Sequence, residues 1–347
     1  MSEEKIPVTG NSRALIIWLV SCAAMVAVMM LIGAITRLTE SGLSMVEWRP
    51  LIGALPPLST PEWERVFDLY RKTSEYRLEN AGMSLSDFKT IFWWEFIHRL
   101  WGRLIGVVFG VPLIWYWWRG YIPPRLRPHL FALFVLGAVQ GIIGWWMVKS
   151  GFVDRHDVSQ YRLTVHLSMA FLILGYILWL VADLATGVNA VSRTADWLRH
   201  FLSATLIVVF VTVMSGGLVA GLGAGFDYNT WPLIAGAWVP SDLFGTVPFW
   251  NAAFDDILTV QFDHRMLAYV TVASVLCVSG FGYRLAQSRW QKLILLLFAG
   301  MAVMQIALGI ATLLSVVAIP LAVLHQAGAI LLFSAAILAR QAFGRGG

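Results

Sequence analysis

The sequence has little cysteine and little charge. Its two cysteines, Cys22 and Cys277, lie in apolar stretches, and no Cys-x-x-Cys or Cys-x-x-Cys-His motif occurs in the 347 residues. These absences exclude the usual motifs of dithiol redox enzymes, iron–sulfur sites and c-type haem attachment. Charged residues make up 13% of the chain, against roughly 25% in soluble domains. The formal net charge of +5 comes without a basic run, so a nucleic-acid partner is not expected.

Apolar residues are what the chain has in abundance. They make up 58% of the sequence, with a mean hydropathy of +0.71 and 17 tryptophans, a composition typical of a polytopic membrane protein. Eight segments reach the length of about 20 residues that a membrane-spanning helix needs. They lie at roughly 14–36, 92–118, 128–148, 162–184, 199–221, 257–283, 290–314 and 318–340. We therefore predict an all-α integral membrane protein with eight transmembrane helices.

Basic residues are concentrated in alternate short loops. Arg119, Arg125 and Arg127 follow the second predicted span, and further Lys and Arg residues follow the fourth and the sixth, whereas the 222–256 stretch has none. By the positive-inside rule, both termini are predicted to be cytoplasmic. The first residues carry acids and resemble neither a transit peptide nor a cleaved signal. This favours a bacterial inner membrane over a mitochondrial one.

The two halves of the chain repeat each other. Three motifs recur: a glycine six positions before a tryptophan (Gly42 and Trp48; Gly225 and Trp231), Phe-x-His-Arg (96–99; 262–265) and Gln-x-x-x-Gly (140–144; 305–309). Each half contains four predicted spans in the same orientation. We therefore predict two tandem four-helix bundles, 1–190 and 191–347, related by a parallel repeat.

Four histidines occupy equivalent positions near the starts of apolar helices: His98 and His166 in the first half, His264 and His325 in the second. A histidine inside a membrane span is costly unless it is paired or ligated, and the topology predicts all four at similar depth, toward the periplasmic side. Histidines on facing helices of a bundle suit haem iron, so we predict two haem sites. No carboxylate or thiolate completes a zinc site in the second half; the residues alone leave copper open.

The halves differ at one position that bears on chemistry. Glu95 stands three residues before His98, on the same helix face, where the second half has Gln261. A carboxylate beside a ligated iron can accept a proton or stabilise a developing cation, which an amide cannot do. We therefore predict that Glu95 is catalytic and that the second half transfers electrons. The alternative is a structural ion pair of Glu95 with Arg99 or Arg103.

Two further pairs of equivalent residues are candidates for polar contacts. Arg99 and Arg265 directly follow two of the histidines, and their guanidinium groups match the carboxylates of haem propionates in geometry. The alternative is that both side chains extend to the membrane interface. Gln140 and Gln305 lie inside predicted spans and are predicted to donate interhelical hydrogen bonds.

Six stretches of the sequence together are highly specific: 33–45, 48–57, 95–103, 154–166, 226–232 and 262–265. Through them the chain resembles the haem A synthase family over nearly its whole length. It lacks the outer-loop cysteine pair that some members carry, which fits the branch shared by alphaproteobacteria and mitochondria.

The resemblance implies an enzyme that converts haem O to haem A for cytochrome oxidase biogenesis, by oxidising the C8 methyl group to a formyl group through successive hydroxylations. In the family, the histidines matching His264 and His325 hold the iron of a haem b cofactor. Those matching His98 and His166 belong to the substrate haem site, and the glutamate matching Glu95 is important for activity. Haem O synthase and cytochrome oxidase assembly factors are candidate partners beside the lipid bilayer, and a homo-oligomer stays open.

Two other functions are compatible with the same motifs. A di-haem b-type cytochrome would relay electrons without changing a substrate, although such a relay needs no asymmetry between Glu95 and Gln261. A haem transporter or chaperone could also use internal repeats. Transporter repeats usually carry broken helices at the membrane midplane, whereas these histidines are predicted near one surface.

Overall fold

The computed structural model describes residues 10–47, 53, 55–153, 158–186, 196–245 and 248–344. Within these ranges the chain is built of helices and contains no strand. Three parts of the motifs above, residues 48–52, residue 54 and residues 154–157, lie outside the described residues.

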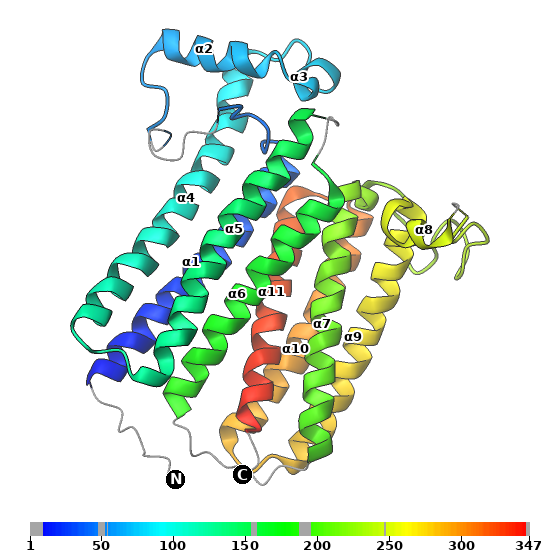
Figure 1. Ribbon diagram of the computed structural model, residues 1–347. Helices are drawn as coiled ribbons and strands as arrows, with labels where there is room; N and C mark the ends of the chain where they lie inside the picture. The colour runs from blue at the N-terminus through cyan, green and yellow to red at the C-terminus, as the bar shows by residue number, and fades with distance from the viewer. Residues whose placement is uncertain are drawn as a thin grey trace. The chain divides into compact units, whose positions relative to one another are not determined.

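Eight helices in these ranges are long and apolar enough to cross a membrane (Figure 1). They are α1 (Gly10–Leu38), α4 (Leu85–Trp118), α5 (Arg127–Val153), α6 (Gln160–Thr186), α7 (Asp196–Leu222), α9 (Ile257–Leu285), α10 (Arg289–Leu314) and α11 (Ile319–Ala342). The shortest, α11, has 24 residues and is about 36 Å long at 1.5 Å per residue, which exceeds the hydrocarbon core of about 30 Å. The prediction of an all-α protein with eight spans is confirmed.

The second span extends further than the sequence predicted. α4 begins at Leu85 instead of near residue 92, because the Ser84 hydroxyl accepts a hydrogen bond from the Asp87 backbone N–H at 3.2 Å and caps the helix. With 34 residues, α4 is about 51 Å long, which exceeds the hydrocarbon core of about 30 Å. His98 therefore lies about four turns into α4.

Short helices occupy the connections between the spans. α2 (Thr60–Tyr70) and α3 (Ser74–Leu78) lie between α1 and α4, and η2 (Pro124–Leu126) precedes α5. η3 (Ala224–Phe226) and α8 (Phe249–Asp255) lie between α7 and α9. Ser59 and Thr73 provide side-chain N-caps for α2 and α3, which satisfy backbone N–H groups that a helix start leaves unpaired.

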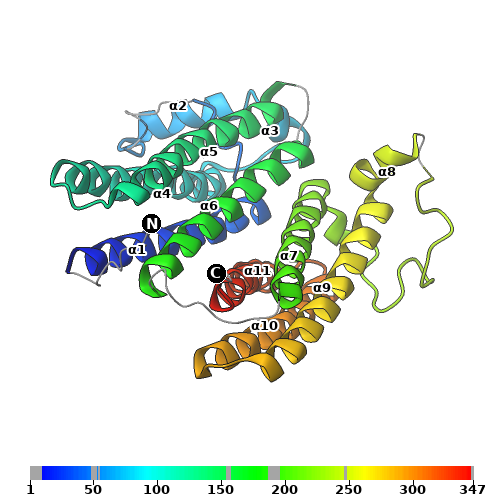
Figure 2. The same ribbon diagram turned by 60° about the horizontal axis from the view of Figure 1, so that its bottom comes forward.

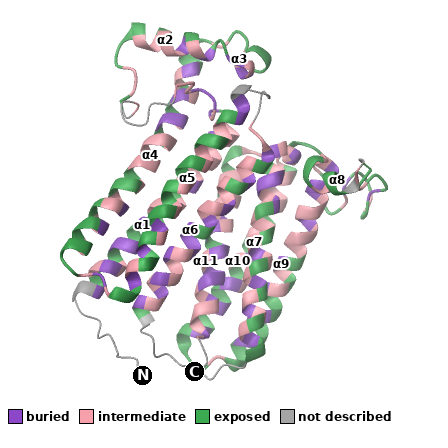
Figure 3. Ribbon diagram, viewed as in Figure 1, coloured by how far each residue is buried: buried purple, intermediate pink, exposed green. Residues whose placement is uncertain are grey.

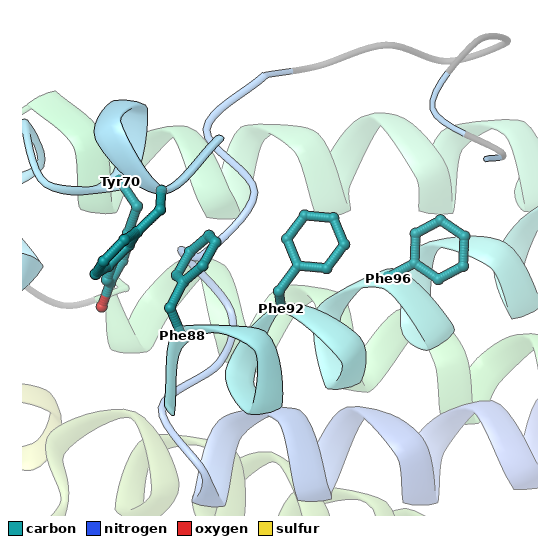
Figure 4. Packing of buried hydrophobic residues seen from close by; sticks show 5 residues of the cluster. Tyr70, Phe88, Phe92 and Phe96 are labelled. Atoms are coloured by element: carbon teal, nitrogen blue, oxygen red, sulfur yellow. The ribbon is translucent and has the colours of Figure 1, made fainter. Parts of the chain in front are cut away.

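Aromatic side chains bind α2 to the first turns of α4. Phe88, Phe92 and Phe96 recur every four residues and therefore share one face of α4, where they form a cluster with Phe67 and Tyr70 of α2 (Figure 4). All five side chains are at most 4% exposed, and the Phe67 and Phe88 rings stack with centroids 4.8 Å apart. The cluster fixes the part of α4 that leads to its histidine.

The chain forms two compact units, Met1–Ala27 with Leu167–Gly347, and Val28–His166. In the first unit α7, α9, α10 and α11 close a ring, in which α7 packs against α9 and α11, and α10 packs against the same two helices (Figure 2). In the second unit α4 packs against α2 and α5, and α3 packs against α5. The division into halves at residues 190 and 191 stays a prediction.

The outward faces of the spans are apolar. On α4, Val107, Val111 and Ile114 follow one another at helical spacing and are 56%, 61% and 71% exposed. A similar exposed stretch runs along α5 (Figure 3). Apolar surface of this extent fits contact with lipid tails.

Candidate functional site

The structure brings each predicted histidine pair together. His98 of α4 and His166 of α6 belong to one compact unit, and His264 of α9 and His325 of α11 belong to the other. The two imidazoles of each pair are close enough to interact electrostatically. Residues far apart in the chain are therefore combined into two sites of the same composition.

In the first pair, each imidazole packs against a glycine of the preceding span. A Cβ atom placed on Gly33 of α1 would lie 3.1 Å from His98 Cε1, and one on Gly144 of α5 would lie 2.9 Å from His166 Cε1. Carbon atoms normally pack at about 3.5–4.0 Å. Any larger residue at these positions would therefore press on the ring.

The second pair is built in the same way. A Cβ atom on Gly216 of α7 would lie 3.2 Å from His264 Cε1, and one on Gly309 of α10 would lie 2.9 Å from His325 Cε1. A close glycine–imidazole contact thus occurs at all four histidines. Glycine allows the backbone of a neighbouring helix to approach each imidazole closely, and this contact limits where the ring can lie.

Two glutamines hold the backbone of two of these histidines. Gln140 Nε2 donates a hydrogen bond to the His166 carbonyl, and Gln305 Nε2 donates one to the His325 carbonyl, both at 3.0 Å. The predicted interhelical hydrogen bonds are therefore confirmed. Each glutamine stands four residues before the glycine that contacts the same histidine, so both lie on one helix face.

Arg99 and Arg265 bind the chain segments that follow α1 and α7. Their acceptors are backbone carbonyls at equivalent positions of the repeat: Met45 and Glu47 for Arg99, at 2.9 and 3.2 Å, and Tyr228 and Thr230 for Arg265, at 2.8 and 2.9 Å. Each guanidinium thus ties a connection to the helix that carries a histidine. Contacts of these two arginines with haem propionates stay a prediction.

Glu95 is buried against the segment that follows α1. The residue is only 3% exposed. Its carboxylate accepts hydrogen bonds from Ser44 Oγ at 2.7 Å and from the Met45 backbone N–H at 2.6 Å. It also forms an ion pair with Arg99, so the structural ion pair that the sequence allowed as the alternative is present. These three donors satisfy a carboxylate that would otherwise be costly to bury.

Gln261, at the position equivalent to Glu95, lies against hydrogen-bond acceptors of the connection that follows α7. Its Nε2 donates to the carbonyls of Ala224 and Asp227 at 2.5 and 2.7 Å, and its Oε1 accepts from Arg265 at 2.6 Å. Both side chains accept a hydrogen bond from the arginine four residues later. The neighbouring connection, however, offers donors to Glu95 and backbone acceptors to Gln261. The difference between the halves extends beyond one side chain to the connection that surrounds it.

The segment that surrounds Glu95 is anchored to α2. Arg65 donates to both carboxylate oxygens of Glu47, at 3.2 and 3.0 Å, and also to Glu62. The hydrogen bonds that Arg65 donates to Glu62, the larger cause, and to Glu47 raise the pKa of Arg65 above its usual value. Because the two side chains of the Arg65–Glu47 pair are 38% and 34% exposed, the pair contributes little to stability; its effect is to position the segment.

Each histidine pair fits haem iron better than a metal ion held by protein alone. Among the described residues, no group of three or more His, Cys, Asp or Glu side chains could hold a metal ion, so a four-ligand zinc site is not formed there. Haem iron needs only axial ligands from the protein, because the porphyrin supplies the other four. The Nδ1 atoms of His98, His166 and His325 are buried and have no hydrogen-bond partner within the described chain.

The repeat in the sequence includes Gly144 and Gly309 but gives no indication that they contact histidines. Gly33, Gly216 and Ser215 were not predicted from the sequence as site residues. A signal for the missed glycines was present. Gly33 and Gly216 each stand nine positions before the glycines at 42 and 225, which begin a repeated motif. For Ser215 the sequence offers no comparable signal, since the equivalent residue of the first half is Ile32.

The fold and these sites define a multi-pass membrane protein with two equivalent histidine pairs whose rings pack against glycines of neighbouring helices, and one pair has a buried carboxylate beside it. Residues 16–337 match the family described as cytochrome oxidase assembly protein (COX15-CtaA). The chain belongs to this family.

Individual relatives cover almost the whole chain. It is 48% identical to the heme A synthase of Rhodospirillum centenum over 320 residues, which are 92% of this chain and 86% of that protein. It is 47% identical to the heme A synthase of Paramagnetospirillum magneticum over 340 residues, 97% and 95% of the two chains. For the heme A synthase of Nitrosospira multiformis the identity is 45% over 328 residues, 94% and 92%.

Proposed function

We propose that this chain is an oxidoreductase that converts haem O to haem A, by oxidising the C8 methyl group of the porphyrin to a formyl group. The observation that carries the proposal is the presence of two equivalent histidine pairs, of which only the His98 pair has a buried carboxylate, Glu95, one helical turn away. Family membership and similarity to proteins named heme A synthase support the reaction.

The two histidine pairs are proposed to bind two different haems, one a cofactor and the other the substrate. His264 and His325 would hold the iron of a haem b cofactor, in the half that comprises residues 191–347. When bound, haem b supplies one-electron transfer at its iron. His98 and His166, in the half that comprises residues 1–190, would bind the iron of the substrate haem O. The glycines under the four rings support this assignment, because they fix where each imidazole lies.

Glu95 is the proposed catalytic residue. From its position beside His98 its carboxylate can accept a proton released as the methyl group is oxidised, or stabilise positive charge that develops on the substrate. Its hydrogen bonds to Ser44 and Met45 hold it in place for that role. The equivalent Gln261 has no such capacity, which supports a purely electron-transferring second half.

Arg99 and Arg265 are proposed to contact haem propionates in addition to their carbonyl acceptors. Arg265 Nε is buried and has no hydrogen-bond partner among the described residues, so one N–H of this guanidinium is available for a further acceptor. A propionate carboxylate is an acceptor of the geometry that guanidinium favours.

The protein is a multi-pass membrane protein, and we propose the bacterial inner membrane as its location, with both termini cytoplasmic and the histidines toward the periplasmic side. The eight candidate spans are an even number, which supports termini on the same side, and the basic loops support the cytoplasmic one. Haem O synthase and cytochrome oxidase assembly factors are proposed partners, and self-association is compatible with the exposed apolar faces.

Pigment analysis of the purified protein tests the proposed function. Haems extracted with acid and separated by chromatography are expected to contain haem B together with haem O or haem A. Haem B alone, at two per chain, would instead identify an electron-relay cytochrome. A protein without haem would contradict both functions.

The glycine contact under His325 gives a further expectation. Gly309→Ala is expected to lower the haem b bound per chain by about tenfold, in the range found when a residue that orients a metal ligand is changed. The reason is that the new Cβ would lie 2.9 Å from His325 Cε1, so the ring must move. The measurement is the ratio of haem b to protein after purification.

The same helix provides the control for this variant. Gly300 is also on α10, and a Cβ atom placed there meets nothing within 4 Å. Gly300→Ala is therefore expected to leave the haem b content unchanged, since alanine in a helix costs less than glycine. Equal haem content in the two variants would show that the contact does not position His325.

A further inference from the structure

His264 differs from the other three histidines in the environment of its Nδ1 atom. This atom lies 2.7 Å from the hydroxyl of Ser215 on α7. For His98, His166 and His325, Nδ1 is buried and has no partner in the part of the chain that the structure describes. One histidine of the four is therefore held by a side-chain hydrogen bond.

A second hydrogen bond of Ser215 determines which atom carries the proton. Ser215 Oγ donates to the Thr212 carbonyl at 2.8 Å, and a carbonyl can only accept. Because a hydroxyl has a single proton to donate, its oxygen must accept from His264 Nδ1–H. The neutral imidazole then carries its lone pair on Nε2, which is the nitrogen left to bind a metal.

The residue that holds the ring and the residue that makes room for it are neighbours in the chain. Gly216 follows Ser215 and makes the close contact with His264 Cε1, at 3.2 Å for an added Cβ. In the first half Gly33 has the same role for His98, but Ile32 precedes it. The glycine is therefore repeated and the hydroxyl is not.

We propose that Ser215 is a positioning residue of the haem b site, which fixes the tautomer and orientation of His264 and increases electron donation from its Nε2 to iron. This inference rests on the proposed function in one respect, that His264 and His325 hold haem b. A hydrogen-bond acceptor on the second nitrogen of a ligating histidine fixes the ring and raises the basicity of the ligand, which favours ferric over ferrous iron. The asymmetry suits the two tasks: a resident cofactor must be retained, whereas a substrate haem must leave the His98 site after the reaction.

Redox titration of the haem b in purified variants tests this proposal. Ser215→Ala and Ser215→Val are expected to raise the midpoint potential, with about a tenfold change in the ferrous-to-ferric ratio at a fixed potential, which is about 59 mV for one electron. Ser215→Thr keeps a hydroxyl that can also donate to a backbone carbonyl one turn earlier, so its potential is expected to stay near that of the wild type. Valine and threonine have nearly the same shape, so this comparison isolates the hydroxyl.

Ser279 provides the matched control. It is a buried serine on α9, 6% exposed, and its hydroxyl has no hydrogen-bond partner within the described residues. Ser279→Ala is expected to leave the potential unchanged.

The haem content and the potentials of these variants together test the role of Ser215. Loss of haem b in the Ala and Val variants but not in the Thr variant would also support the proposal. Unchanged potentials in Ala and Val, or equal effects of Val and Thr, would overturn it while leaving the proposed function intact. A wild-type protein that contains no haem b would overturn both.

Discussion

His264→Ala is expected to abolish the low-spin haem b spectrum of the purified protein. The substitution would remove one of the two proposed haem ligands, and it leaves Ser215 and Gly216 on α7 facing the space that the imidazole had filled. A six-coordinate low-spin haem then becomes high-spin or is lost from the protein. The reduced-minus-oxidised optical spectrum and the ratio of haem to protein measure the effect.

His200 provides the control for this substitution. It is exposed in the first turns of α7, and its Nδ1 lies 2.8 Å from the Asp196 backbone carbonyl of its own helix. His200→Ala is expected to keep the full low-spin spectrum. An intact spectrum in His264→Ala would refute the assignment of this residue as a haem ligand.

Glu95→Gln is expected to reduce haem A production by about 100-fold or more, the usual range for loss of a general acid or base, while the haem b of the second pair is kept. The amide cannot accept a proton, and its NH2 group would face the Ser44 and Met45 donors that now serve the carboxylate. Production is measured as the haem A fraction of extracted haems, in cells that lack their own enzyme.

Ser44→Ala separates a catalytic from a purely structural role of Glu95. It removes one of the hydrogen bonds that hold this part of the chain but keeps the carboxylate. If Glu95 is catalytic, Ser44→Ala is expected to reduce haem A production less than Glu95→Gln does, because the Met45 N–H and Arg99 still hold the carboxylate. Equal losses in the two variants would identify Glu95 as an anchor, and unchanged production in Glu95→Gln would refute the catalytic role outright.

Much of the fold could be predicted because hydropathy reports directly on the solvent around a helix. A bilayer core requires every backbone polar group to be satisfied within the segment, so long apolar stretches can only be helices here. The start of α4 could not be placed in this way. Its first turns are stabilised by the Ser84 cap and by packing of Phe88 and Phe92 against α2, which are tertiary and local polar effects instead of hydropathy.

The candidate site could be predicted in its residues but only partly in its geometry. The repeat identified the four histidines, because equivalent residues in a duplicated scaffold occupy equivalent places. It also suggested a role for Glu95 but not its partners Ser44 and Met45. Those partners lie about fifty positions earlier in the chain, in a connection whose path depends on how α1 and α4 are joined.

The amino-acid sequence is enough to indicate eight membrane-spanning helices, four histidines that recur between the two halves of the chain, and a carboxylate at position 95 that does not recur. These properties are carried by residue types and their spacing. The packing of the helices shows, in addition, that each of the four imidazoles rests on a glycine of another helix and that, among the described residues, Ser215 is the side chain that contacts the Nδ1 atom of one of them. Such contacts depend on differences of a few tenths of an ångström in the separation of two helices, which no pattern along a single chain encodes.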